Sequence, residues 1–225
     1  LYDFNDKINF ISTRHESAAS FMAEAYGKLT GEVGICFVTR GPGAANASIG
    51  VHTAMQNSSP MILFIGQIGR DMTEREAFQE IDYKAYFGSI SKWVVQVNNA
   101  DRLPEIIGRA FSMALSGRPG PVVVSLPEDM LRDLTSAVAI NKIQKTCAEI
   151  SVTQVNLIKD ELENSKKPLI ICGGGGWSDV GRCYLKRFAE SVNIPVICGF
   201  RNQDLMDTNS FAYVGDASFG KPQYI

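Results

Sequence analysis

Short apolar runs alternate along the chain with longer stretches in which apolar residues recur at helical spacing. The runs are rich in β-branched residues and nearly continuous, which is typical of parallel strands buried on both faces. They predict strands at residues 9–13, 33–39, 61–65, 91–97 and 122–126. The stretches between them predict helices at 16–30, 44–56, 82–87 and 102–116. This alternation indicates an α/β fold with a mostly parallel sheet flanked by helices.

The pattern weakens after the last of these strands and resumes near residue 152. Residues 128–151 have scattered charges and no sustained period, so we interpret them as a linker. Beyond them the sequence predicts helices at 152–164 and 179–192, and strands in "PLIICGGGG" and "PVICGF". We therefore assign residues 1–127 to a first domain and 152–225 to an incomplete second α/β domain. The chain reads as an excerpt of a larger protein whose first strand is missing.

Composition and charge exclude several classes of function. The net charge of −2, without a basic cluster, gives no footprint for nucleic acid. No apolar run reaches the roughly 18 residues of a membrane span, and no signal peptide opens the chain. The five cysteines show no C-x-x-C spacing, which predicts free thiols in a reducing compartment. We expect a cytoplasmic protein that binds neither nucleic acid nor membranes.

Two glycine-rich turns follow predicted strands. In "TRGPGAAN" the residues Gly41, Pro42 and Gly43 lead into a helix that also carries Asn46. The free N–H groups at such a helix start can hold an anion, but from this motif alone an unliganded strand-to-helix turn is the favoured interpretation.

The second of these turns lies in "ICGGGGWSD". Its glycines, Gly173, Gly174 and Gly175 among them, suit a close approach to a nucleotide pyrophosphate. A structural tight turn remains an equal alternative, because the spacing does not match G-x-G-x-x-G.

An acidic residue, Glu16, stands at the predicted start of the first helix, next to His15. The helix macrodipole alone would favour a carboxylate there. The small residues of "SAASFMAEAYG" instead predict a tight apolar setting, which would raise the proton affinity of Glu16 and suit it to exchange a proton with a cofactor. Phe78 and Gln79 lie in a long loop that forms either a site wall or plain surface.

The order of these motifs resembles one family. "RHE" before an alanine-rich helix, then "GPG", "AFQE", "KW" and "GRPGPVVVSLPEDM" are similar to the pyrimidine-binding domain of thiamine-diphosphate enzymes, closest to the acetolactate synthase large subunit group. "GFRNQDLMDTNSFAYVGDASFG" resembles the later part of that family's central domain. The resemblance covers essentially the whole chain.

The resemblance implies specific roles. The glutamate matched by Glu16 hydrogen-bonds N1′ of the aminopyrimidine and exchanges a proton with it, so that the cofactor can attack a 2-keto acid and take up the electrons of decarboxylation. The turn at 41–43 lies near the pyrimidine, and Phe78 and Gln79 lie beside cofactor and substrate. Two subunits form each site in this family, which implies a homo-oligomer, a dimer or tetramer.

Three departures from the family pattern concern cofactors. Arg40 stands where acetolactate synthases have serine before the Gly-Pro-Gly turn. The family's FAD-contacting arginine corresponds to Ile106, and Arg109 is the nearest cation. The sequence therefore does not decide whether FAD binds. No "GDG" motif with its later asparagine occurs, so we expect the ligands of magnesium and the diphosphate on a domain absent from this chain.

The leading hypothesis is a thiamine-diphosphate-dependent carboligase or decarboxylase of 2-keto acids, with Glu16 as the catalytic residue and this chain alone inactive. A pyruvate oxidase or oxalyl-CoA decarboxylase type is the alternative within the family. A non-catalytic nucleotide-binding α/β module is the alternative outside it.

Overall fold

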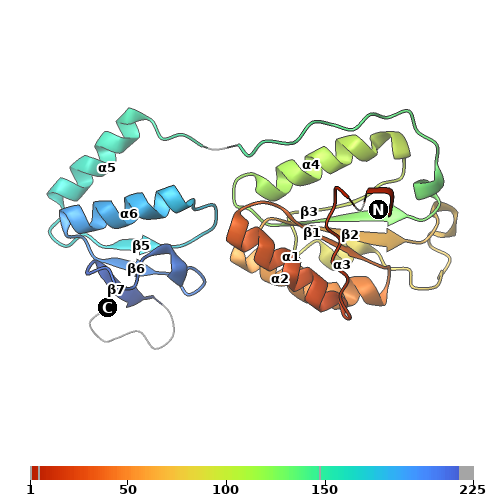
Figure 1. Ribbon diagram of the computed structural model, residues 1–225, viewed down its shortest axis with the longest axis horizontal. Coiled ribbons are helices and arrows are strands. Elements are labelled where there is room, and N and C mark those ends of the chain that lie inside the picture. The colour runs from red at the N-terminus through yellow and green to blue at the C-terminus, as the bar shows by residue number, and fades with distance from the viewer. Residues whose placement is uncertain (1, 5, 147, 218–225) are drawn as a thin grey trace. The chain divides into compact units, whose positions relative to one another are not determined.

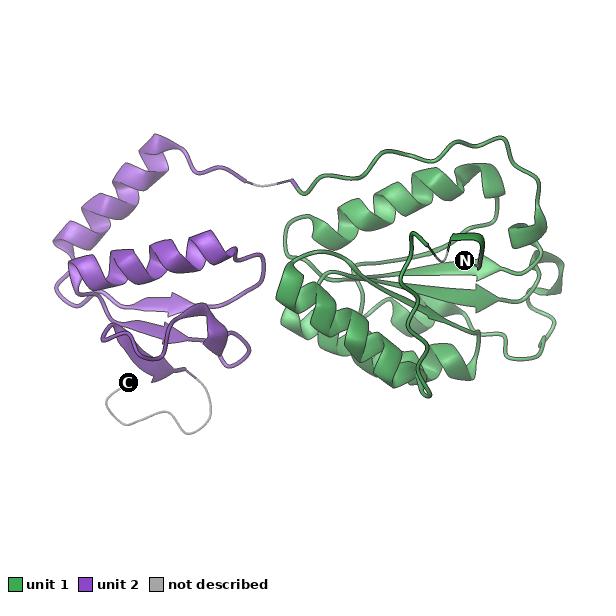
Figure 2. Ribbon diagram, in the orientation of Figure 1, with its two compact units in different colours: residues 1–145 green, residues 146–225 purple. Residues whose placement is uncertain are grey.

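The computed structural model describes residues 2–4, 6–146 and 148–217. The chain divides into two compact units, Leu1–Lys145 and Thr146–Ile225 (Figure 2). The division falls inside the segment 128–151, whose first part packs on the first unit: the Ile140 side chain lies against Gly108. Each unit is described separately below.

The first unit is built on four parallel strands in the order β1-β2-β4-β3. Their bounds are β1 Gly34–Val38, β2 Met61–Gln67, β3 Trp93–Gln96 and β4 Pro121–Pro127. The two central strands, β2 and β4, are buried almost throughout, which explains why their sequences are continuously apolar. The predicted α/β class with a parallel sheet is confirmed.

Helices cover both faces of this sheet (Figure 1). One face packs against α1, α2 and α3, and the other packs against α4. Their bounds are α1 Glu16–Thr30, α2 Pro42–Asn57, α3 Tyr83–Phe87 and α4 Leu103–Leu115. Single 3₁₀ turns lie at Tyr2–Phe4, Arg70–Met72, Ala100–Arg102 and Met130–Arg132. Because α1 and α2 both run antiparallel to the strands, both begin at the carboxyl edge of the sheet.

The strand predicted at residues 9–13 is wrong. This stretch is irregular, and its large side chains Phe10 and Ile11 are exposed. A strand exists only when a neighbour completes its hydrogen bonds, and β1 is the edge of the described sheet, paired only with β2. The β-branched composition of residues 9–13 is compatible with a strand, but without a neighbouring strand to pair with it does not produce one.

The helices α1 and α2 touch through small side chains. Gly50 lies so close to α1 that a Cβ added to it would stand 2.3 Å from Ser20 Oγ and 2.8 Å from the Ser20 carbonyl carbon. Ala23, Ala47 and other small residues fill the rest of this contact. The small residues of the sequence thus serve close helix packing.

A buried carboxylate joins the middle of α1 to the end of α2. Glu24 of α1 is 6% exposed and accepts hydrogen bonds from Asn57 Nδ2 at 2.9 Å and Ser59 Oγ at 2.7 Å. Arg118 completes the junction by donating to Ser58 Oγ and to the carbonyl of Met55 at the end of α2. Each partner satisfies a polar group that packing removes from water.

We expect Glu24→Ala to destabilise the chain by about 1–3 kcal/mol, because the buried Ser59 hydroxyl and the half-buried Asn57 amide would lose their acceptor. Urea denaturation measures this loss. Glu32→Ala is the control: Glu32 is exposed and meets Lys142 only at 4.0 Å, so its removal should change stability by less than about 0.5 kcal/mol. Equal effects of the two substitutions would contradict the role given to Glu24.

The second unit holds a smaller parallel sheet, β5-β6-β7, with α6 packed on it. The bounds are α5 Val152–Asn164, β5 Ile170–Cys172, α6 Asp179–Val192, β6 Val196–Cys198, a 3₁₀ turn at Gln203–Leu205, and β7 Tyr213–Asp216. The sequence analysis foresaw both helices and the first two strands but missed β7. The end of the predicted second domain, residues 218–225, lies outside the described residues.

Candidate functional site

Glu16 is the first residue of α1, and its position is set by the residue before it. His15 is the N-cap: its Nδ1 accepts a hydrogen bond from the Ser17 backbone N–H at 3.2 Å and lies 2.7 Å from Ser17 Oγ. Without a strand at 9–13, Glu16 follows a loop rather than a strand end. The helix start, and not the end of a strand, therefore sets the backbone position of Glu16.

One oxygen of the Glu16 carboxylate is held by α2. Asn46 Nδ2 donates to Glu16 Oε2 at 3.1 Å. The backbone N–H of Glu16 itself and then the Asn46 amide lower the pKa of Glu16, and these outweigh the small opposing effect of burial. The predicted rise in proton affinity is thus wrong for this chain, because the carboxylate is only partly covered and is stabilised in its ionised form.

The turn at 41–43 lies beside this carboxylate. Gly41 has φ 60° and ψ −115°, a backbone conformation that side chains disfavour, and its N–H donates to Tyr83 Oη at 3.0 Å. A Cβ on Gly43 would lie 3.6 Å from Glu16 Oε1. Gly43 therefore presents bare backbone toward the second carboxylate oxygen. Pro42 occupies the first helical position, which explains why α2 begins two residues before its predicted start.

The loop between β2 and α3 approaches the other side of this turn. A Cβ on Gly41 would lie 2.6 Å from Gln79 Cβ, so the absence of a side chain at Gly41 is what admits Gln79. Gln79 itself has φ 66°, and Glu74 and Glu76 of the same loop also have positive φ. Such backbone costs about 1–3 kcal/mol per residue and concentrates at functional sites. Phe78 is 78% exposed.

The structure thus brings together Glu16, Asn46, the turn at 41–43 and Gln79. All follow the carboxyl ends of parallel strands or stand at the helix starts there, where open α/β sheets bind ligands. Tyr83 was missed by the sequence analysis, although it lies in the same "AFQEIDYKAYF" stretch as Phe78. Tyr83 is placed in the site only by the hydrogen bond that its Oη accepts from the Gly41 N–H, 42 positions away in the sequence.

The glycines of the second turn belong to the second unit. Gly173 follows β5, and its carbonyl accepts from Trp177 Nε1 at 3.1 Å. The Gly174 carbonyl accepts from Asn202 Nδ2 at 2.9 Å, and Gly174 has φ 75°. With Gly175, this turn is closed by hydrogen bonds within its own unit.

Comparison with known families decides what this arrangement belongs to. The profile described as "Thiamine pyrophosphate enzyme, N-terminal TPP binding domain" matches residues 2–86, and "Thiamine pyrophosphate enzyme, central domain" matches residues 155–224. The chain belongs to the thiamine pyrophosphate enzyme family. The first profile spans Glu16, the turn at 41–43 and the loop that carries Gln79.

Several curated relatives within this family are acetolactate synthases. The chain is 34% identical to the acetolactate synthase isozyme 3 large subunit of Escherichia coli over 197 residues, 85% of this chain and 34% of that protein. It is 36% identical to the Lactococcus lactis large subunit over 203 residues (84% and 34%). Against the mitochondrial catalytic subunit of Saccharomyces cerevisiae it is 34% identical over 230 residues (94% and 33%). The chain spans about a third of the length of these relatives.

The residues present fit a thiamine pyrophosphate enzyme. The Glu16 carboxylate faces a glycine turn without side chains, and the Asn46 amide holds one of its oxygens. Among the described residues, no group of three or more histidine, cysteine or acidic side chains could hold a metal ion. Nor does any helix in the described part of the chain have the length and apolarity to cross a membrane.

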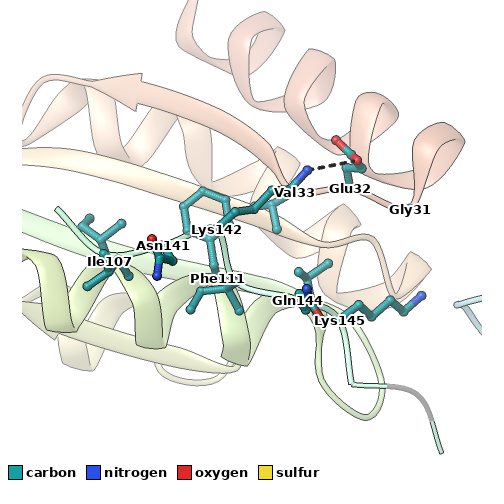
Figure 3. Close-up of a pocket in the computed structure, with 12 residues that line it drawn as sticks. Gly31, Glu32, Val33, Ile107, Phe111, Asn141, Lys142, Gln144 and Lys145 are labelled. Atoms are coloured by element: carbon teal, nitrogen blue, oxygen red, sulfur yellow. Dashed lines mark ion pairs between the residues drawn. The ribbon is translucent and has the colours of Figure 1, made fainter.

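A cavity of about 530 Å³ lies elsewhere in the first unit (Figure 3). Ile107, Phe111 and Leu115 of α4 line one side, and residues 31–33 and 140–145 line the rest. Glu32 and Lys142 form an exposed ion pair at its rim. Its lining includes none of the predicted site residues, so its size carries no argument about the chemistry.

Proposed function

We propose that this chain contributes the aminopyrimidine-binding part of a thiamine-diphosphate-dependent enzyme that acts on 2-keto acids, a carboligase of the acetolactate synthase type. The observation that carries the proposal is the Glu16 carboxylate, held by Asn46 and facing Gly43 at the carboxyl edge of the sheet. When bound, thiamine diphosphate supplies the nucleophilic carbon and the electron sink that decarboxylation needs.

Each nearby residue has one task in this proposal. Glu16 gives and takes a proton at N1′ of the aminopyrimidine through Oε1, while Asn46 holds Oε2 and fixes the plane of the carboxylate. The backbone at 41–43 lets the ring approach closely. Gln79 contacts the cofactor or the substrate, and the exposed Phe78 ring covers them from water. Cover of this kind would raise the pKa of Glu16 from its lowered value toward neutrality, where proton exchange is fastest.

Three further parts of the proposal concern cofactors. Magnesium and the diphosphate are held by residues outside this chain, which is consistent with relatives about three times as long. FAD is an optional second cofactor. The turn of Gly173, Gly174 and Gly175 contacts a phosphate-bearing ligand, because positive φ and bare backbone at a strand end allow that approach.

We also propose a homo-oligomer in which each site is shared between subunits. The helix that carries Glu16 exposes Phe21, Met22 and Tyr26, which lie on its outer surface away from the sheet. Exposed apolar groups of this kind mark interfaces. A second subunit on this helix would also complete the cover over Glu16. We place the enzyme in the cytoplasm, where free thiols such as the buried Cys36 stay reduced.

The whole protein, supplied with thiamine diphosphate and magnesium, should convert pyruvate to acetolactate, and this chain alone should not. Acetolactate is measured by its conversion to acetoin in acid. Consumption of oxygen with pyruvate, or release of carbon dioxide from oxalyl-CoA instead of acetolactate formation, would assign the protein to the other types. Nucleotide binding without turnover of any 2-keto acid would support the non-catalytic module.

A further inference from the structure

Arg40 places a cation at the same edge of the sheet as Glu16. It lies between β1 and the turn at 41–43, and its backbone nitrogen would stand 3.8 Å from a Cβ on Gly66 near the end of β2. Its side chain crosses the end of β2, and Nη1 donates to Glu128 Oε2, beyond β4, at 2.8 Å. A guanidinium is thus held one residue from Gly41, in the region where the proposed substrate would bind.

Stability alone does not explain this arginine. The Arg40 side chain is 27% exposed and that of Glu128 is 59% exposed, and exposed pairs of this kind add little to folding. Arg40 Nε is buried and has no hydrogen-bond partner among the described residues. A buried donor without an acceptor destabilises a fold, so the presence of Arg40 at this position needs an explanation other than stability.

The charge of Arg40 reaches the groups around the turn. Burial raises the pKa of Tyr83, whose oxygen accepts from the Gly41 N–H, and this hydrogen bond and the positive charge of Arg40 act in the opposite direction. The guanidinium is therefore close enough to stabilise negative charge beside the 41–43 turn.

We propose that Arg40 binds the carboxylate of the 2-keto acid, an inference that rests on the proposed function. A guanidinium offers a planar fork of donors that matches a carboxylate, and a two-point contact is stronger than the single bond to Glu128. Glu128 is then an internal competitor that occupies the guanidinium until the substrate carboxylate replaces it. This assigns substrate selection to Arg40, and proton exchange remains with Glu16.

The test compares pyruvate with its uncharged methyl ester in the whole protein. Arg40→Met should raise the KM for pyruvate about 10- to 100-fold, because a charged hydrogen-bonded contact is lost. Methyl pyruvate is assayed as an inhibitor of C2 proton exchange on the cofactor, measured without pyruvate. Its inhibition constant should differ less than about twofold between Arg40→Met and wild type. Arg40→Lys should recover part of the affinity for pyruvate.

Arg102→Met is the matched control, because Arg102 forms a similar exposed ion pair with Glu105 on α4. The KM of this variant for pyruvate should stay within about twofold of wild type.

The substitution Glu128→Gln separates substrate binding from a structural role. With the competitor removed, the KM for pyruvate should fall about two- to fivefold. If the Arg40–Glu128 ion pair only holds the turn against β4, both Arg40→Met and Glu128→Gln should weaken the binding of pyruvate and of its ester to the same degree. That result would overturn the proposal. Wild-type turnover of pyruvate with an unchanged KM in Arg40→Met would overturn the role of Arg40 alone. A wild-type protein that neither exchanges the C2 proton nor consumes pyruvate would overturn the proposed function as well.

Discussion

Replacing Glu16 with glutamine should cut pyruvate turnover by the whole protein about 10²- to 10⁴-fold and leave its fold intact. The amide has the size and shape of the carboxyl, and its oxygen can still accept from Asn46 Nδ2, which the structure places 3.1 Å from Oε2. What it cannot do is give and take a proton at N1′. Hydrogen–deuterium exchange at C2 of the cofactor measures that step directly, before any substrate binds.

A matched control separates this effect from a change of charge. Glu32→Gln removes one exposed acid from the same unit and should leave the exchange rate unchanged. Thermal unfolding and magnesium-dependent cofactor binding of the Glu16→Gln variant should also match wild type. If that variant exchanged the C2 proton at the wild-type rate, Glu16 would have no catalytic role. Its carboxylate would then serve only to stabilise the start of α1, where the macrodipole favours a negative charge.

Much of the fold could be read from local signals. The bounds of α5 and α6 follow the sequence because Ser151 and Ser178 cap their first turns, and Asn193 ends α6 in the left-handed conformation. The buried strands β2 and β4 are apolar throughout, so their existence was also clear. The stretch at 9–13 carried an equally good local pattern and formed no strand, because pairing depends on a neighbour and not on composition.

The gathering of the site residues follows from topology, but the chemistry of Glu16 does not. Parallel strands bring the 41–43 turn and the loop around Gln79 to one edge, so their proximity could be foreseen. The pKa of Glu16 depends on which donors reach it and how much protein covers it. Small neighbours in the sequence suggested burial, yet Ser20 and Ala23 pack against α2 while Ala18 is exposed. Asn46 and the helix start keep the carboxylate ionised.

Contacts between distant residues were the least predictable part. No pattern in "AFQEID" announces that Gln79 adopts φ 66°, because that conformation is held by the loop around it: Glu80 accepts from the backbone N–H groups of Glu74 and Ala77. The bonds from Arg40 to Glu128 and from Gly41 to Tyr83 span 88 and 42 positions of sequence. Such pairs exist only after the sheet has formed.

The second large effect should come from Gly50, one helical turn after Asn46 on α2. In Gly50→Ala the new Cβ would meet Ser20 Oγ at 2.3 Å and the Ser20 carbonyl carbon at 2.8 Å, so α1 must move away from α2. Overpacking of this kind costs about 1–3 kcal/mol, of which the better helix propensity of alanine offsets at most about 1. The first unit should therefore unfold at a temperature roughly 3–8 °C lower in calorimetry. Gly181→Ala in α6 is the control. Its nearest contact is 3.3 Å, to Ser178 Oγ, which a shift of a few tenths of an ångström relieves, so its loss of stability should be clearly smaller than that of Gly50→Ala.

The same substitution should reach the site, because the spacing of α1 and α2 sets the distance between Glu16 and Asn46. A helix displaced by a few tenths of an ångström weakens a 3.1 Å hydrogen bond. We therefore expect Gly50→Ala to slow C2 exchange in the whole protein as well as to destabilise it. Adding Ser20→Gly removes the side-chain atoms that the new methyl group meets but leaves the Ser20 carbonyl carbon at 2.8 Å. The double variant should therefore recover only part of both losses, a coupling expected of residues in contact. Recovery of stability without recovery of exchange would show that the proton transfer does not depend on how closely α1 lies against α2.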